Sequence, residues 1–208
     1  MELVRHPDHL EAQHRRLLER RIRTVSELVE SGTPLVAVAA LYRSTLRTRP
    51  TTLMPLARSV DHVTTRSLAP AERGVRPLEV ERTAWAMQNA VRLDALGLLL
   101  IARVQLLEQQ DPQLARGQAL RDARRYARNR AAVIARDQIG TLTSTVFIAR
   151  AGQFGVQRYQ WWSRRDTRVR DLHVRLHGTI RRIDDPHPTE GHPGDAINCR
   201  CGRRPIWP

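Results

Sequence analysis

Lysine is absent from this chain, and aromatic residues and cysteines are scarce. All 35 basic side chains are arginines, and with only 21 acidic residues the formal net charge is +14. Self-repulsion of that size disfavours a compact isolated state, so an anionic partner such as nucleic acid is expected. The planar guanidinium of arginine suits bidentate contact with phosphate or carboxylate. The alternative explanation for the absence of lysine is a GC-rich genome, in which arginine codons replace lysine codons.

Long apolar runs are also missing. Residues 1–16 contain no apolar segment of the kind that begins a secretory signal, and the longest apolar run, 95–101, is far too short to span a bilayer. We therefore expect a soluble, unsecreted chain with no membrane partner.

The shortage of aromatic side chains bears on the fold. Aromatic residues make up 4% of the chain, against 41% for hydrophobic residues as a whole, and this balance suits long helices better than a β-sandwich or a barrel. A length of 208 residues allows one ordinary domain or two unequal parts. We expect a mainly α protein in which an extended helical region, residues 1–129, packs or anchors the chain. A small α+β module, residues 130–208, follows it.

Apolar periodicity predicts the helices. The apolar residues from Leu10 to Val29 follow helical spacing. Asp8 is placed to cap the start of this helix and Gly32 its end. Further helices are expected at 34–46, at 78–110 and from Gln113 to 151, where the last helix either continues or restarts near residue 131. A strand is expected at 156–162. Mixed signals come from residues 51–77, which contain the helix-breaking prolines Pro55, Pro70 and Pro77.

Residues 78–110 give the strongest helix signal. The segment is rich in leucine and alanine and is apolar nearly all round in its second half, so it must pack against something. The side chains available for burial are Trp85, Met87, Val91, Leu98 and Ile101. Two interpretations remain open, a core helix of a bundle or a helix docked on another subunit.

Several arginines gather in the next predicted helix. The candidates for contact with DNA or a protein partner are Arg121, Arg124, Arg125 and Arg128. Three of them, Arg121, Arg125 and Arg128, share one helical face. A solvated surface explains such a run equally well, and the functional interpretation is a stripe that follows DNA phosphates or meets an acidic wall.

Both cysteines and four of the eight histidines lie near the end of the chain. A disulfide between Cys199 and Cys201 would be strained and would close almost no loop. Clustered His and Cys in a loop-rich segment favour a metal instead, zinc above all, which would also stabilise roughly fifty residues with few aliphatic side chains. The expected ligands are His173, His192, Cys199 and Cys201, with His177 and His187 in reserve. The alternative is that the histidines bond to the backbone and the cysteines are buried as small hydrophobes.

An ordered set of motifs runs through the same segment. An aromatic strand with a tryptophan is followed by Asp, Arg-Val-Arg, a histidine three residues on, a glycine, and a closing Pro-Gly and Asn-Cys-Arg-Cys. The residues that carry this order are Tyr159, Trp161, Asp166, Arg168, Val169, Arg170, His173, Gly178, His192, Pro193, Gly194, Asn198, Cys199, Arg200 and Cys201. Over residues 130–205 the chain resembles the phage Mu protein F-like head-morphogenesis family.

The resemblance implies a function in a tailed phage or a phage-like particle. A member of this family is expected to be a minor head protein of the virion, inside the capsid near the portal, that acts in head morphogenesis, DNA packaging or DNA ejection after synthesis in the bacterial cytoplasm. Its expected partners are the portal protein, the major capsid or scaffold protein, and packaged double-stranded DNA bound by nonspecific phosphate contact. No enzymatic activity and no catalytic residue are expected.

The resemblance also gives a second group of residues a structural role. These are Trp161, Asp166, Arg168, Arg170, Gly178, Asn198 and Arg200. Asp166 either supplies an oxygen ligand to a metal or pairs with Arg170. The alternative function is a metal-dependent hydrolase or nuclease that uses a zinc-bound water, with Asp166 or His177 as general base.

Overall fold

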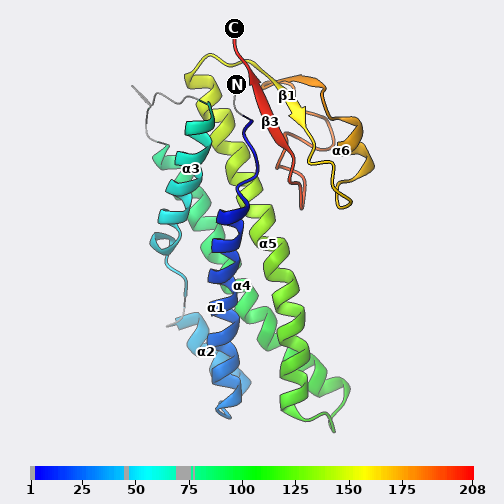
Figure 1. Ribbon diagram of the computed structural model, residues 1–208. Coiled ribbons are helices and arrows are strands. Elements are labelled where there is room, and N and C mark those ends of the chain that lie inside the picture. Colours follow the sequence, from blue (N-terminus) through cyan, green and yellow to red (C-terminus); the bar gives the residue numbers. More distant parts are fainter. Residues whose placement is uncertain (1–2, 45–46, 69–75, 77) are drawn as a thin grey trace. The chain divides into compact units, whose positions relative to one another are not determined.

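The computed structural model describes residues 3–44, 47–68, 76 and 78–208 (Figure 1). Its helices are α1 (Asp8–Glu30), α2 (Leu35–Ser44), α3 (Met54–Leu68), α4 (Glu79–Gln110), α5 (Arg116–Gln153) and α6 (Asp171–Arg175), with a 3-10 turn, η1, at Pro50–Thr52. The strands are β1 (Arg158–Trp162), β2 (Ile180–Arg182) and β3 (Gly202–Ile206). The expectation of a mainly helical protein with a small α+β part near its C-terminus is confirmed. No helix in the described part of the chain has the length and apolar character needed to cross a membrane.

Helix α1 confirms the helix predicted from the apolar stripe. Asp8 lies in its first turn, where a carboxylate is stabilised by the positive end of the helix dipole. After Glu30 the chain turns at Gly32, whose φ of 82° lies in the left-handed region that glycine adopts at low cost.

The helices predicted at 78–110 and after Gln113 are confirmed as α4 and α5. The helix expected to continue or to restart near residue 131 is continuous and forms α5. The boundary predicted between residues 129 and 130 therefore falls inside a helix and coincides with no break in the backbone.

Residues 51–77 contain more regular structure than their prolines suggested. Helix α3 covers 15 residues, and Pro55 lies in its first turn. A backbone N–H has no helical partner there, so a proline removes no hydrogen bond. The helix predicted at 34–46 is present as α2, whereas Leu46, Pro70 and Pro77 lie outside the described residues.

The chain divides into two compact units, and both are discontinuous in sequence. Unit 1 comprises residues 1–11, 54–85 and 136–208, and unit 2 comprises residues 12–53 and 86–135. Long helices contribute to both units, so the units do not follow the predicted division into residues 1–129 and 130–208.

Unit 2 has a core of aliphatic side chains and alanines from four helices. Its buried residues include Leu18 and Val25 of α1, Tyr42 of α2, Leu96 of α4 and Ala123 of α5. Small residues on α5 allow close approach of a neighbouring helix, which explains how few large rings this core needs.

Two of the α4 side chains that were available for burial are exposed in this structure. Trp85 and Ile101 are buried as expected, but Met87 is 56% exposed and Val91 is 63% exposed. Periodicity correctly groups apolar residues on a helical face, but the described residues of unit 2 do not cover this face of α4.

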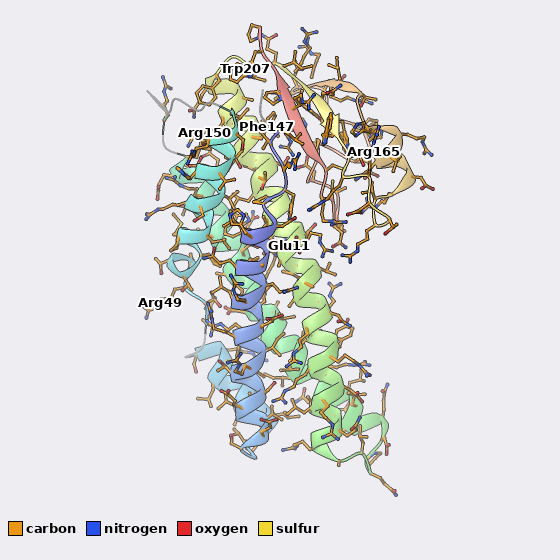
Figure 2. All side chains as sticks on the ribbon, viewed as in Figure 1. Glu11, Arg49, Phe147, Arg150, Arg165 and Trp207 are labelled. Atoms are coloured by element: carbon orange, nitrogen blue, oxygen red, sulfur yellow. The ribbon has the colours of Figure 1, made fainter. Side chains whose placement is uncertain are left out.

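Unit 1 contains the antiparallel sheet, in the order β2-β1-β3. Val4 extends the sheet by exchanging backbone hydrogen bonds of 2.9 and 3.0 Å with Arg203. On β1, Tyr159 and Trp161 alternate into the core, where the Tyr159 ring meets Phe147 of α5 edge-on at a centroid distance of 6.0 Å. Figure 2 labels Phe147 on this helix.

A buried ion pair joins the helices of unit 1. Asp61 of α3 accepts hydrogen bonds of 3.0, 2.7 and 2.9 Å from Arg150, in the last turn of α5 (Figure 2). Arg82 of α4 donates a further bond of 2.8 Å to the same carboxylate. Both oxygens of the buried Asp61 are therefore satisfied by charged donors, which is the condition under which a buried carboxylate is tolerated.

Candidate metal centre

Three of the four expected metal ligands come together in unit 1. His173 lies in the short helix α6, and Cys199 and Cys201 lie in the extended segment that leads into β3. Their exposed fractions are 3%, 3% and 5%. The chain reaches this position through left-handed backbone at Gly194 and Asn198, with φ of 98° and 61°. Asn198 is one of the few residue types other than glycine that adopt this conformation readily.

The distances within this cluster fit a zinc ion. Nδ1 of His173 lies 3.6 Å from Sγ of Cys199 and 3.5 Å from Sγ of Cys201, and the three ligand atoms all lie within 4.8 Å of one another. Tetrahedral zinc with ordinary Zn–S and Zn–N bond lengths places nitrogen and sulfur ligands about 3.6 Å apart. The donor set and its spacing are therefore those of a mixed nitrogen and sulfur zinc site.

Glu190 orients the histidine of this cluster. Its Oε2 lies 2.6 Å from Nε2 of His173 and 3.0 Å from Nη1 of Arg170. When Nε2 carries the proton and donates it to Glu190, the Nδ1 lone pair faces the two sulfurs. A carboxylate on the far nitrogen of a histidine is the usual support of a metal ligand. Sequence analysis missed Glu190, although it lies between His187 and His192.

The cluster also changes the proton affinity of its members. A hydrogen bond from Cys201 is the main cause that lowers the pKa of Cys199, with help from His173 and from the N–H of Gly194, 3.2 Å away. The pKa of Cys201 is raised, mainly by that shared hydrogen bond and by burial. Hydrogen bonding to Cys199 raises the pKa of His173. The lowered pKa of Cys199 favours its thiolate, which is the form of cysteine that binds a metal.

The remaining histidines of the segment have different partners. His192, the fourth expected ligand, is not among the residues of the cluster, and its Nδ1 lies 2.9 Å from the hydroxyl of Tyr159. Nδ1 of His177 accepts the backbone N–H of Ser163 at 3.1 Å. Nδ1 of His187 accepts the backbone N–H of Glu190 at 3.3 Å. The structure therefore unites His173, Cys199 and Cys201 without these three.

Asp166 pairs with Arg200 rather than with Arg170. Two bonds of 2.8 and 2.6 Å join Nη2 of Arg200 to the Asp166 carboxylate, which also accepts the backbone N–H of Arg168 at 3.1 Å. The expected pair with Arg170 is thus wrong, because Arg170 is bound to Glu190. Asp166 does not belong to the cluster of possible ligands.

The remaining motif residues surround the cluster. The buried ring of Trp161 meets the His173 ring edge-on at 5.3 Å. The N–H of Gly178, at a φ of 84°, donates to the carbonyl of Trp161 at 2.8 Å and closes the turn after α6. The side-chain oxygen of Asn198 accepts a bond of 3.2 Å from Arg136. These contacts support a structural role for the motif.

A cavity of about 50 Å³ adjoins the cluster. Its walls include Arg168, Arg170 and Asn198 together with the three possible ligands. This volume holds a water molecule but no nucleotide or peptide. The cavity therefore has room for a water molecule beside the three possible ligands but not for a substrate of that size.

A second group of possible ligands, His6, Asp8 and Glu11, is held by ion pairs and hydrogen bonds. Nε2 of His6 lies 2.9 Å from Glu11, and Arg164 donates to Asp8 at 2.7 Å. Arg136 lies 3.3 Å from Glu11. The carboxylates of this group are already neutralised by cations, so the group needs no metal.

The predicted arginine cluster of α5 divides into two kinds of residue. Arg124 is partly buried and forms an ion pair of 2.7 Å with Glu30. Arg121 and Arg128 are exposed, and Arg125 is exposed with a contact of 3.2 Å to Asp122. The face formed by Arg121, Arg125 and Arg128 remains available to a partner, whereas Arg124 supports the unit.

Comparison with known proteins agrees with the motif analysis. Residues 104–203 match the family described as "Phage Mu protein F like protein", so the predicted resemblance is confirmed. The match includes the whole His173, Cys199 and Cys201 cluster.

A relative is found among curated proteins. An uncharacterized protein of Haemophilus influenzae (strain ATCC 51907 / DSM 11121 / KW20 / Rd) is 34% identical over 87 residues, which are 42% of this chain and 20% of that protein. The chain thus spans about a fifth of the length of this relative. No solved structure matches.

Proposed function

With residues 104–203 identified as a phage Mu protein F-like segment, we propose that the chain is a structural minor head protein that binds zinc through His173, Cys199 and Cys201. It acts inside the capsid near the portal, in head assembly, DNA packaging or DNA ejection. The observation that carries this proposal is the position of the cluster within the matched family segment, where the order of motifs and the geometry of a metal site coincide.

The proposed role of zinc is to stabilise the C-terminal part of unit 1. The strands of this part contain only five, three and five residues, and α6 contains five. Elements so short bury little apolar surface, and a structural metal is a common means of holding such a segment together. Zinc would join α6 to the segment before β3, with a water or a partner's side chain as the fourth ligand.

The proposed partners follow from charge and family. The exposed face of Arg121, Arg125 and Arg128 and the net charge of +14 favour nonspecific contact with packaged double-stranded DNA. The portal protein is the proposed protein partner, with the major capsid or scaffold protein as further candidates.

Co-expression with the portal protein of the same phage tests this role. We expect the tagged chain to elute with the portal ring in size-exclusion chromatography and to be detected by mass spectrometry in purified particles. Particles that lack the chain, together with a portal ring that does not retain it, would contradict the proposal.

A metal-dependent hydrolase is the second candidate function. One observation favours it: the structure unites three protein ligands, and a catalytic zinc keeps one position open for water. The expected general bases do not belong to the cluster, because Asp166 is bound to Arg200 and His177 accepts a bond from Ser163. We expect no turnover of DNA or nucleotides by the zinc-loaded chain, and hydrolysis that disappears in His173→Ala would favour the enzyme instead.

A further inference from the structure

An apolar groove lies between α2 and α4 in unit 2. Its volume is about 400 Å³, and its walls are Tyr42, Arg43, Arg47, Val91, Asp94, Ala95 and Leu98. The groove lies outside residues 104–203, so it shares no residue with the matched family segment or with the His173 cluster. Its volume is in the range of sites that accept several side chains or a small ligand.

The floor of the groove is formed by the closely packed ring of Tyr42. The ring of Tyr42 lies so close to Gly97 that a Cβ at that position would come within 2.3 Å of the ring. The Tyr42 hydroxyl donates to the carbonyl of Leu93 at 3.3 Å. Asp94, the acidic residue of the wall, is occupied by the N–H and hydroxyl of Thr48, at 2.9 and 2.8 Å. The glycine therefore allows the ring to form a fixed apolar floor against the backbone of α4.

Exposed apolar residues continue the groove along α4. Met87 and Val91 are 56% and 63% exposed, and Ala95 and Leu98 follow them in the wall of the groove. Steps of four, four and three residues keep these side chains on one face of the helix over about three turns. A linear row of this kind matches the apolar seam of a second helix better than it matches a compact small molecule.

Charge identifies the kind of helix that fits. Arg43 and Arg47 form the rim of the groove, and both are exposed. A second copy of the chain would bring its own arginines and its own net charge of +14 to this surface. We propose that the groove binds an amphipathic helix of another protein whose apolar stripe is flanked by carboxylates.

Two synthetic peptides test this inference on the full chain. Both contain about four heptads with leucine at the apolar positions, and one has glutamate and the other lysine at the flanking positions. We expect the fluorescein-labelled glutamate peptide to bind at least about tenfold more tightly than the lysine peptide in fluorescence anisotropy. Absence of binding by the glutamate peptide, or equal binding of both, would overturn the proposal.

Variants of the arginine rim and of the apolar row on α4 test the proposal further. Arg43→Glu/Arg47→Glu is expected to reverse the preference between the two peptides. Val91→Glu is expected to weaken the binding of the glutamate peptide by about tenfold or more. Circular dichroism establishes that each variant is folded. A matched control, Arg16→Glu/Arg23→Glu, makes the same change in net charge at exposed positions of α1 and is expected to retain the preference.

Two further measurements complete the design. Val36→Glu introduces a charge at a residue that is 74% exposed but does not line the groove, and it is expected to bind like the parent chain. Sedimentation velocity of the chain alone is expected to show no dimer through this surface. A dimer that Val91→Glu dissociates would identify a second copy as the occupant and would overturn the proposal.

Discussion

Replacement of Glu190 by glutamine tests whether the carboxylate supports a metal ligand. The substitution keeps the size of the side chain and removes the charge that faces Nε2 of His173 at 2.6 Å. Loss of such a supporting partner weakens metal binding by about 10- to 100-fold, which corresponds to roughly 1.4 to 2.8 kcal/mol. We expect Glu190→Gln to shift the zinc affinity by this amount, measured by competition with a chromophoric chelator at fixed pH.

Asp184→Asn provides the matched control for this measurement. Asp184 lies in the same loop region and pairs with Arg182 at 2.6 Å, but both side chains are more than half exposed. The control is expected to bind zinc like the parent chain. If Glu190→Gln also retained the parent affinity, the inference that Glu190 orients His173 for a metal would be refuted.

Three other predictions concern the scaffold. Asp61→Asn leaves the buried Arg150 without its charged partner, so we expect a loss of about 3 to 5 kcal/mol and a fall of roughly 6 to 20 °C in Tm by calorimetry. Gly97→Ala is expected to destabilise the chain by about 1 to 3 kcal/mol in urea unfolding, because the clash with Tyr42 outweighs the better helix propensity of alanine. A hydrogen bond from Arg164 lowers the pKa of Asp8, so the charged carboxylate stabilises the fold at neutral pH. We expect Asp8→Asn to have a lower Tm than the parent chain at neutral pH, and this difference in Tm to shrink as the pH falls below about 4.

Each of these predictions has a control. Asp185→Asn makes the same change at an exposed site, so it is the control for Asp61→Asn. It is expected to leave Tm nearly unchanged. Gly117→Ala is the control for Gly97, because its new Cβ would meet only an arginine nitrogen at 3.6 Å. A Gly97→Ala chain as stable as this control would show that Tyr42 moves aside at little cost. For Asp8, a Tm difference that persisted unchanged in acid would disprove the contribution of its charge.

Local signals made most of the helices predictable. Asp8 at its start, the left-handed turn at Gly32 and the apolar stripe between them mark α1 in the sequence. Pro55 misled the prediction for α3, since a proline in the first turn of a helix resembles a helix breaker when the start of the helix is unknown. Met87 and Val91 show a different limit: periodicity identifies the face that they share but not whether another element covers it.

The candidate site was predictable only in part for a related reason. His173, Cys199 and Cys201 carry chemistry that is evident from residue type and spacing, so their grouping was predicted. Glu190 was missed because its role depends on the path of a loop that brings it back against α6. His192 was grouped with the ligands by its position in the sequence, whereas in the structure its ring is bound to Tyr159.

The zinc content of the purified chain tests the central claim most directly. Elemental analysis is made on the parent chain and on a Cys199→Ser/Cys201→Ser variant, both purified without chelators, with circular dichroism as a check on folding. We predict about one zinc per parent chain and its loss in the variant, together with a less stable C-terminal segment. A folded parent chain that contains no metal and acquires none from added zinc would contradict the claim and would leave His173, Cys199 and Cys201 as packing residues.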